Sequence, residues 1–368
     1  MALSLADLAA EPDEHFALDH HPTWDDLFDL HRYLQIGLAD LLADWDVEAL
    51  GPLRLTKGRI RTTAICPAQV LAEVDPFSIN FNMAVGIVCD AAAGVLALHP
   101  AFPQSNGWYR DLEASLRQEH NHLTGFVDGL SATDRADFDH VVDDLCGSLP
   151  ELLGDLRPHR PTVHHRIAAI PDRAVVISGE VDIGVDTRFG RRLDDGVDRL
   201  PRPGRILAEV KSGAFNPRVT DELAHYGLIV SLQQLHQLHH LEQPQRDKPL
   251  GRPESGNPRT VVGCSITLGD LGVTPVALGA EILETAARRV LETTSGLVEI
   301  NQTMETGGAP PTNPGDHCRW CRRVALCPDA PDLVLAELNA SLRPLPAFDP
   351  KFDNSRFDGD EFTDEDDA

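Results

Sequence analysis

Apolar side chains recur at helical spacing over most of the first half of the chain. Leucines appear every three or four residues between Leu27 and Leu42 among acidic neighbours, which predicts an amphipathic helix. Residues 111–153 show the same period, interrupted at 131–134 by the Ser-x-x-Asp pattern of a helix start. We therefore predict that this half is mostly α-helical.

Strand-like and helix-like patterns alternate in the second half. Residues 174–185 and 206–210 are rich in Val and Ile and are joined by a connector of Arg and Asp, which predicts a β-hairpin. A helix is predicted over 220–241, a second strand pair over 261–268 and 274–277, and a last helix over 280–304. The predicted fold class is α/β, with a mixed central sheet flanked by helices.

Composition divides the chain into three parts. Residues 1–56 are predicted to form an N-terminal helical accessory segment, or cap, and 57–330 the main domain. Residues 331–368 become Pro-rich and then acidic, which is typical of a disordered tail. No apolar stretch approaches the roughly 20 residues needed to cross a bilayer, and the N-terminus carries acids instead of the basic start of a signal peptide. We expect a cytoplasmic protein without a membrane segment.

The net charge of −26 argues against a broad nucleic-acid surface, because neutralising phosphates supplies much of the affinity of such surfaces. Residues 349–368 hold nine acids and two bases, a contribution of −7 that leaves −19 for the rest. Arginines cluster in two places, with six between Arg188 and Arg205 and three among the cysteines, at Arg319, Arg322 and Arg323. Any contact with DNA would have to be local.

Acidic and basic side chains stand together on the predicted hairpin. Asp182 lies on the first strand, and Glu209 and Lys211 are two residues apart on the second, so the latter two share one face. Two carboxylates from neighbouring strands can hold Mg²⁺ or Mn²⁺, which prefer oxygen ligands. Such an ion activates a water molecule and stabilises charge on a phosphate, and the lysine can orient or deprotonate that water or neutralise the phosphate.

A solvated salt bridge is the ordinary explanation of an acid two residues before a lysine. The chain has four lysines against 28 arginines, however, so composition alone puts a lysine at a given position roughly once in ninety. A buried lysine can shift its pKa and exchange a proton, whereas an arginine keeps its proton. The use of lysine here favours a catalytic pair.

Three motifs carry a resemblance to a known family. Asp182, then Glu209-x-Lys211, then the segment from Glu222 to Tyr226 occur in this order. Together they resemble the PD-(D/E)XK nuclease superfamily, and within it the RecB-like branch of helicase-nucleases and CRISPR-adaptation exonucleases. The last segment is similar to the family's Gln-x-x-x-Tyr motif, with Glu222 where glutamine is typical. The resemblance covers residues 57–330 and implies a nuclease active site on a mixed sheet.

The resemblance also implies a metal ligand on an upstream helix. The family places a histidine ligand after a glycine there, and aligning the segment that begins at Gly86 puts Asp90 in that position. Asp90 would then bind the Mg²⁺ or Mn²⁺ ion together with Asp182 and Glu209. The alternative is that Asp90 is an ordinary acid on the surface of a helix.

Three of the seven cysteines lie close together, in Cys318-x2-Cys321-x5-Cys327. Three thiolates at this spacing converge on one metal centre, which needs a fourth ligand. Cys66 resembles the lone upstream cysteine that iron-sulfur RecB-like nucleases combine with such a triplet, which implies a 4Fe-4S cluster closing the domain. The alternatives are a zinc site, with His317 as a candidate fourth ligand, and unrelated buried cysteines.

The other cysteines and the paired histidines give weaker signals. Apolar neighbours predict that the remaining cysteines are core residues, and the histidine groups are predicted to be solvated side chains. These residues are Cys89, Cys146 and Cys264, and His164, His165, His236, His239 and His240.

The resemblance implies Mg²⁺- or Mn²⁺-dependent cleavage of DNA, exonucleolytic rather than endonucleolytic, on single strands or ends, in DNA repair, CRISPR adaptation or phage defence. The chain has no Gly-x-x-x-x-Gly-Lys-[Ser/Thr] loop, so unwinding would have to come from a helicase or another nucleic-acid-processing partner. Two alternatives are a catalytically silent DNA-binding or scaffold subunit of a helicase-nuclease complex, and a nuclease closed by zinc.

Overall fold

The chain forms two compact units, each made of segments that are discontinuous in the sequence. The computed structural model describes residues 3–16, 21–72, 79–102, 107–189, 202–241, 258–315, 317–318, 321, 324, 327 and 329–330. The first unit combines Met1–Ile36, Asp75–Pro171 and Ile177–Val290, and the second combines Gly37–Val74, Asp172–Val176 and Leu291–Ala368. The predicted tail, 331–368, and most of the arginine-rich connector lie outside the described residues.

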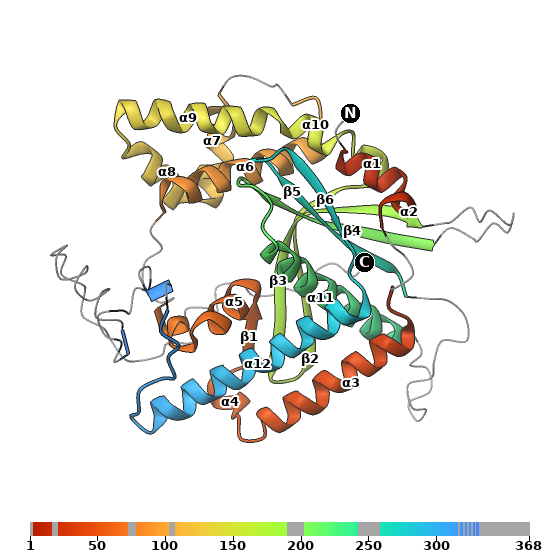
Figure 1. The fold of residues 1–368 in the computed structure, drawn as a ribbon, viewed down its shortest axis with the longest axis vertical. Coiled ribbons are helices and arrows are strands. Elements are labelled where there is room, and N and C mark those ends of the chain that lie inside the picture. Colours follow the sequence, from red (N-terminus) through yellow and green to blue (C-terminus); the bar gives the residue numbers. More distant parts are fainter. Residues whose placement is uncertain are drawn as a thin grey trace, which may run out of the picture. The chain divides into compact units, whose positions relative to one another are not determined.

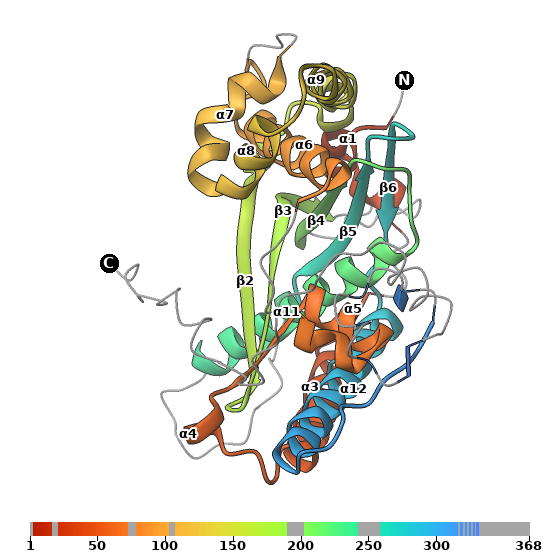
Figure 2. The same cartoon turned by 90° about the vertical axis from the view of Figure 1, so that its left-hand side faces the viewer.

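A mixed sheet of six strands runs through the described residues, in the order β1-β3-β4-β5-β6 with β2 paired to β3 (Figures 1 and 2). β3 and β4 are antiparallel, β4 and β5 parallel, and β5 and β6 antiparallel. The predicted α/β class with a mixed central sheet flanked by helices is confirmed. The strands are β1 (Leu53–Thr56), β2 (Thr162–Asp172), β3 (Val175–Phe189), β4 (Arg202–Lys211), β5 (Thr260–Thr267) and β6 (Gly272–Val276).

Most of the predicted helices are present. The two long ones in the second half are confirmed as α11 and α12, and the predicted helix start at Ser131 is confirmed because its side chain accepts the Asp134 N–H. The helices are α1 (Leu5–Ala10), α2 (Pro12–His15), α3 (Trp24–Leu41), α4 (Val47–Leu50), α5 (Lys57–Ile65), α6 (Phe81–Leu98), α7 (Trp108–Glu119), α8 (Asn121–Asp128), α9 (Ala132–Gly147), α10 (Leu149–Leu153), α11 (Arg218–Leu241) and α12 (Ala280–Glu305), with short 3-10 turns at Pro67–Ala72 and Arg157–His159.

Helices α6 and α11 pack on opposite faces of β4 in the first unit. Ile206, Ala208 and Val210 of β4 join the apolar core to which α6 contributes. Because alternate residues of a strand face opposite sides, Glu209 and Lys211 face α11 instead. The candidate site therefore lies between the sheet and α11.

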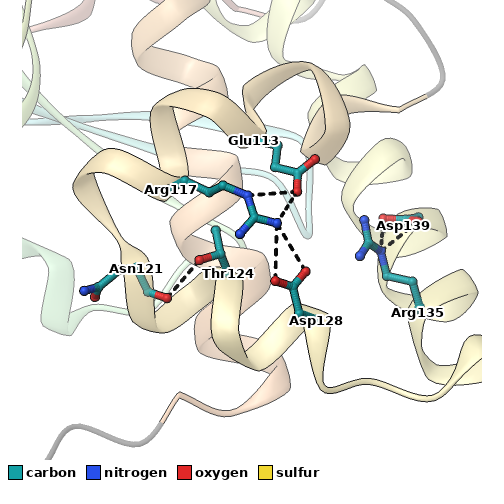
Figure 3. Close-up of polar contacts among 7 residues, drawn as sticks. All are labelled: Glu113, Arg117, Asn121, Thr124, Asp128, Arg135 and Asp139. Carbon is teal, nitrogen blue, oxygen red and sulfur yellow. Dashed lines mark hydrogen bonds and ion pairs between the residues drawn. The ribbon is translucent and has the colours of Figure 1, made fainter.

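Helices α7, α8 and α9 gather with α6 over a shared apolar core, and their surface carries ion pairs (Figure 3). Arg117 on α7 donates to Glu113 on the same helix at 2.7 Å and to Asp128 at the end of α8 at 3.2 Å. Arg135 and Asp139 pair along α9 at 3.1 Å. Exposed pairs of this kind contribute little to stability, so the buried apolar face holds these helices together.

Two of the strands were not predicted from the sequence. β2 begins with the polar run Thr-Val-His-His-Arg, and its mixture of exposed and buried positions obscures the period-two alternation that indicates a strand. β1 has only four residues, too few to give a pattern, and it bonds to the start of β3 through Leu53 N and Ala174 O at 2.8 Å.

Of the described helices, α6 alone is long and apolar enough to span a membrane, judged by length and composition. This helix has 18 residues, so the expectation that no apolar stretch approaches the roughly 20 residues of a membrane span is not met. Half of the helix is buried inside the protein. α6 supplies much of the apolar core of the first unit. The cytoplasmic location stays a prediction.

Candidate functional site

The carboxylate of Glu209 is buried between β4 and α11, where it meets the ammonium of Lys211. Glu209 is 1% exposed. Lys211 Nζ lies 2.7 Å from Glu209 Oε1 and 2.8 Å from Glu222 Oε2 on α11. Burial lowers the pKa of Lys211, but the charges and hydrogen bonds of the two glutamates outweigh it, so the net shift of this pKa is upward. The lysine is a cation held between two carboxylates.

Asp182 lies where β3 and β4 separate. The register of the two strands ends at the pair Ile183 and Ala208. Beyond it, Asp182 Oδ2 accepts the main-chain N–H of Val210 at 2.7 Å, and the residue is 9% exposed. A main-chain donor thus fixes this carboxylate beside Glu209, and the predicted positions of the two carboxylates on neighbouring strands are confirmed.

The ring of Tyr226 packs against the backbone of β3 beside these carboxylates. A Cβ on Gly179 would lie 2.7 Å from the ring, so glycine is needed for this approach. The adjacent His225 Nε2 lies 3.0 Å from a main-chain carbonyl of the same part of β3. Burial, and then the negative charges of Glu209 and Asp182, raise the pKa of the Tyr226 hydroxyl. Both carboxylates therefore lie within electrostatic reach of one hydroxyl.

His164 on β2 links Asp90 of α6 to this group. His164 Nδ1 lies 3.7 Å from Asp90 Oδ2 and 3.6 Å from Glu180 Oε1 on β3. Interaction with Glu180 raises the pKa of His164 to about 9 against the opposing effect of burial, and the charges of Asp90 and Asp182 add to the rise. A Cβ on Gly94, one turn after Asp90, would come within 2.9 Å of the His164 ring, so this histidine packs directly on α6.

The expectation that His164 is a solvated side chain is corrected by these contacts. The residue also has a left-handed backbone, with φ of 46°, which is uncommon outside glycine and concentrates at functional sites. Glu180 was likewise not singled out as a candidate. Their partner Asp90 is far away in the sequence, so no local pattern could have indicated the cluster. The side chains of His239 and His240 lie outside the described residues.

The carboxylates of Asp182 and Glu209 suit a hard divalent cation. Among the described residues, no three His, Cys, Asp or Glu side chains are gathered into a preformed metal site. Mg²⁺ needs fewer protein ligands, because one or two carboxylates with water and substrate phosphate complete its coordination. Two buried carboxylates on paired strands meet this requirement, so the donor set fits Mg²⁺ or Mn²⁺.

In the second unit, the four cysteines of the predicted cluster line one cavity of about 70 Å³; they are Cys66, Cys318, Cys321 and Cys327. This volume is several times the roughly 10–15 Å³ that one water molecule needs. Asn313 N and Gly315 N each lie 3.4 Å from a cysteine sulfur, that of Cys66 and that of Cys318 respectively. Main-chain donors to sulfur are typical of metal-bound thiolates. Four thiols around one cavity are the donors that an iron-sulfur cluster takes, although no three of them form a ready-made metal site among the described residues.

The alternative zinc ligand, His317, lines the same cavity, with its Nε2 3.9 Å from Cys318 Sγ. None of the seven cysteines forms a disulfide. The prediction that Cys89, Cys146 and Cys264 are core residues is confirmed, because all three are buried in the apolar core of the first unit.

Comparisons with models of known protein families and with curated proteins give no match. The site brings together five of the residues that the motifs indicate: Asp182, Glu209, Lys211, Glu222 and Tyr226. The sixth, Asp90, contacts His164, which is near this group.

The approach of Tyr226 to β3 is testable by adding one methyl group. Gly179→Ala is expected to lower the free energy of unfolding by about 1–3 kcal/mol, because its Cβ would overlap the buried ring. Urea unfolding followed by circular dichroism measures the change. The matched control is Gly125→Ala on α8, where a Cβ meets nothing within 4 Å and alanine should be neutral or stabilising by up to about 1 kcal/mol. Equal losses in the two variants would contradict this packing.

Proposed function

We propose that this chain is a Mg²⁺- or Mn²⁺-dependent deoxyribonuclease of the PD-(D/E)XK superfamily, in its RecB-like branch. The observation that carries the proposal is the contact of the Lys211 ammonium with both Glu209 and Glu222, beside the carboxylate of Asp182. The sequence motifs single out these same residues. An incidental surface ion pair would not bury its glutamate to 1% exposure, since an ordinary surface pair leaves both groups in water.

Each residue has a role that follows from its position. Asp182 and Glu209 would hold the divalent cation through their carboxylate oxygens, and Asp90, held near them by His164, is a third candidate ligand. The bound cation would lower the pKa of a coordinated water and neutralise charge on the scissile phosphate. Lys211 keeps a positive charge beside Glu209, where it can orient the attacking water or hold the phosphate.

Glu222 and Tyr226 are positioning residues in this proposal. Glu222 on α11 is the second carboxylate that contacts the Lys211 ammonium, at 2.8 Å. Tyr226 packs on β3 at Gly179, with its hydroxyl within electrostatic reach of Glu209 and Asp182. Because both come from one face of α11, that helix sets where the lysine and the carboxylate lie with respect to each other.

The resemblance also suggests the substrate and its setting. Single-stranded DNA or DNA ends would be the substrate, cleaved exonucleolytically in the cytoplasm during repair, CRISPR adaptation or phage defence. A helicase or similar partner would open the duplex, because the sequence has no phosphate-binding loop for ATP.

The second unit would carry a 4Fe-4S cluster as a structural cross-link. The proposal is supported by the common cavity that four cysteines line, although Cys66 is far from the other three in the sequence. A cluster there would stabilise the fold by closing a long loop, and metal ligation would be coupled to folding. The cluster would take no part in phosphate chemistry.

A catalytically silent DNA-binding subunit is the second candidate. It is favoured by the way Glu209 and Glu222 both engage Lys211 and by the absence, among the described residues, of a preformed group of three ligands. A direct cleavage assay separates the two candidates.

The nuclease proposal predicts that Asp182→Asn, Glu209→Gln and Lys211→Met each reduce metal-dependent cleavage of single-stranded DNA by at least about 100-fold. Release of labelled nucleotides with Mg²⁺ or Mn²⁺, and with EDTA as the blank, measures this. Asparagine at position 182 keeps an oxygen that can accept the Val210 N–H, so that variant should retain its fold.

The control for charge is Glu113→Gln on the exposed face of α7, which should cleave at the wild-type rate. Wild-type cleavage by Lys211→Met would show that the active site is wrongly assigned. Failure of the wild-type protein to cleave any DNA with either metal would favour the silent subunit.

The cluster proposal predicts that replacing any one of its four cysteines by alanine lowers the iron content, the absorbance near about 400 nm and the resistance to proteolysis together. Protein purified without oxygen should contain iron and be brown. The positions to change are Cys66, Cys318, Cys321 and Cys327.

The controls are Cys89→Ala and Cys264→Ala, which should keep full iron content and lose at most a few kcal/mol of packing stability. Full iron in Cys66→Ala would show that the fourth ligand is misassigned. One zinc per chain and no iron in anaerobic preparations would replace the iron-sulfur cluster by the zinc alternative.

A further inference from the structure

A polar pocket lies between α11 and the sheet, in the first unit. Its volume is about 130 Å³. The polar part of its lining comes from β2, β4, α11 and the residue that leads into β5, namely His165, Arg205, Gln233, Gln234, Gln237 and Arg259. The proposed cleavage reaction uses none of these residues.

Two arginines in the pocket share one carboxylate. Arg205 Nη1 lies 3.4 Å from Asp186 Oδ1, and Arg259 Nη2 donates to the same oxygen. The side chains of Arg205 and Arg259 are only 19% and 36% exposed. Two guanidinium groups against one carboxylate leave the pocket with a net positive charge in a chain that is otherwise acidic.

Hydrogen-bond donors are left over in this arrangement. Each guanidinium has five N–H groups. Arg259 Nη2 also donates to Gly204 O at 3.2 Å, but Arg259 Nε is buried and has no hydrogen-bond partner within the described part of the chain. The printed contacts therefore use only part of the donor capacity of the two guanidinium groups.

Contacts with β2 and β3 hold the Arg205 guanidinium in place. Its guanidinium lies over Gly184 on β3, where a Cβ would come within 2.6 Å of Nη2, and it donates to Thr162 Oγ1 on β2. Burial lowers the pKa of Arg205; Asp186 opposes this effect and the charge of Arg259 adds to it. The guanidinium is therefore positioned before any ligand arrives.

The pocket and the candidate active site share one face of β4. Arg205 and Glu209 are four residues apart on an unbroken ladder with β5, so they project to the same side. At ~3.3 Å per residue their Cα atoms are about 13 Å apart. At ~3.4 Å per nucleotide this span equals about four nucleotides of a helical strand.

We infer that the pocket of Arg205 and Arg259 binds a phosphate group, supplied by the nucleic-acid strand that is cleaved at Asp182 and Glu209. The inference rests on the proposed nuclease function. Guanidinium forks match the oxygens of a phosphate, and the amide of Gln237 lines the same pocket. Contacts to phosphates fix the register of a strand without reading its sequence. The pocket is thus a positioning subsite, and a terminal or free phosphate has the same chemistry.

Binding of a 20-nucleotide single strand without terminal phosphates tests the inference, measured by fluorescence anisotropy with EDTA to prevent cleavage. Arg259→Gln and Arg205→Gln should each raise the Kd by roughly five- to tenfold and reduce the slope of log K against log salt by about 0.7. Asp186→Asn should lower the Kd, because it removes the anion that competes with phosphate. A purely structural role for the three residues would instead weaken binding in all of them.

Arg157→Gln is the matched control, because it removes one positive charge from an exposed pair with Asp155 and should leave the Kd unchanged. Thermal melting of each variant checks the fold, and Arg259→Gln keeps the test valid if Arg205→Gln does not fold. Wild-type Kd and salt slope in Arg259→Gln, or weaker binding in Asp186→Asn, would overturn the inference.

Two further arms identify the source of the phosphate and separate the inference from the proposed function. An effect of Arg259→Gln confined to 5′-phosphorylated strands, or to competition by inorganic phosphate, would support the site and assign it to a terminal or free phosphate. If the wild-type protein neither binds nor cleaves DNA, the nuclease proposal fails. In that case thermal melting with inorganic phosphate tests the pocket, and phosphate should raise the Tm of the wild type but not of Arg259→Gln. The absence of a rise in the wild type would overturn the inferred phosphate site.

Discussion

Burial of the Glu209 carboxylate is the constraint on which the rest of the site depends. A charge taken out of water is costly unless it is paired and hydrogen-bonded, and this carboxylate is 1% exposed. Lys211 on the same strand and Glu222 on α11 form the chain of charges that compensates it. The helix must therefore lie close over β4, and this closeness also brings Tyr226 down onto β3. One buried charge thus fixes how the helix and the two strands meet.

Glycines in β3 make this close packing sterically feasible. Gly179 leaves room for the Tyr226 ring, and Gly184 leaves room for the Arg205 guanidinium, each at a point where a Cβ would overlap the partner. Between these two glycines, the main-chain pairing of β3 with β4 ends. There the side chain of Asp182, in place of a main-chain carbonyl, accepts the Val210 N–H. β3 thus carries the candidate catalytic carboxylate of Asp182. It also leaves room beside Gly179 for a side chain of α11 and beside Gly184 for a side chain of β4.

The sequence was informative where chemistry follows from local pattern. Asp182, Glu209 and Lys211 lie on strands with clear β patterns, and α11 has clear helical periodicity, so both the strands and the carboxylate pair could be predicted. The cluster of His164 and Glu180 could not be predicted. It depends on the contact of His164 on β2 with Asp90 on α6, and no sequence pattern indicates a contact between two such distant segments. The pocket of Arg205 and Arg259 could not be predicted either, because it also joins residues from distant parts of the sequence. Six arginines near the hairpin indicated local basicity, but only the register of β3 with β4 sets Arg205 opposite Asp186.

The acidity of the chain restricts how a nucleic-acid substrate could reach this site. A net charge of −26 repels phosphates at distances where salt does not screen it, so long-range steering would slow rather than speed association. Among the described residues, the cations that the candidate site and the pocket offer at short range are Lys211, His164, Arg205 and Arg259. If these cations made the main phosphate contacts, the affinity would be weak and its dependence on salt shallow compared with proteins that neutralise many phosphates. A nuclease built this way would act on strands that another protein delivers, which is the role of the helicase partner in the proposed function.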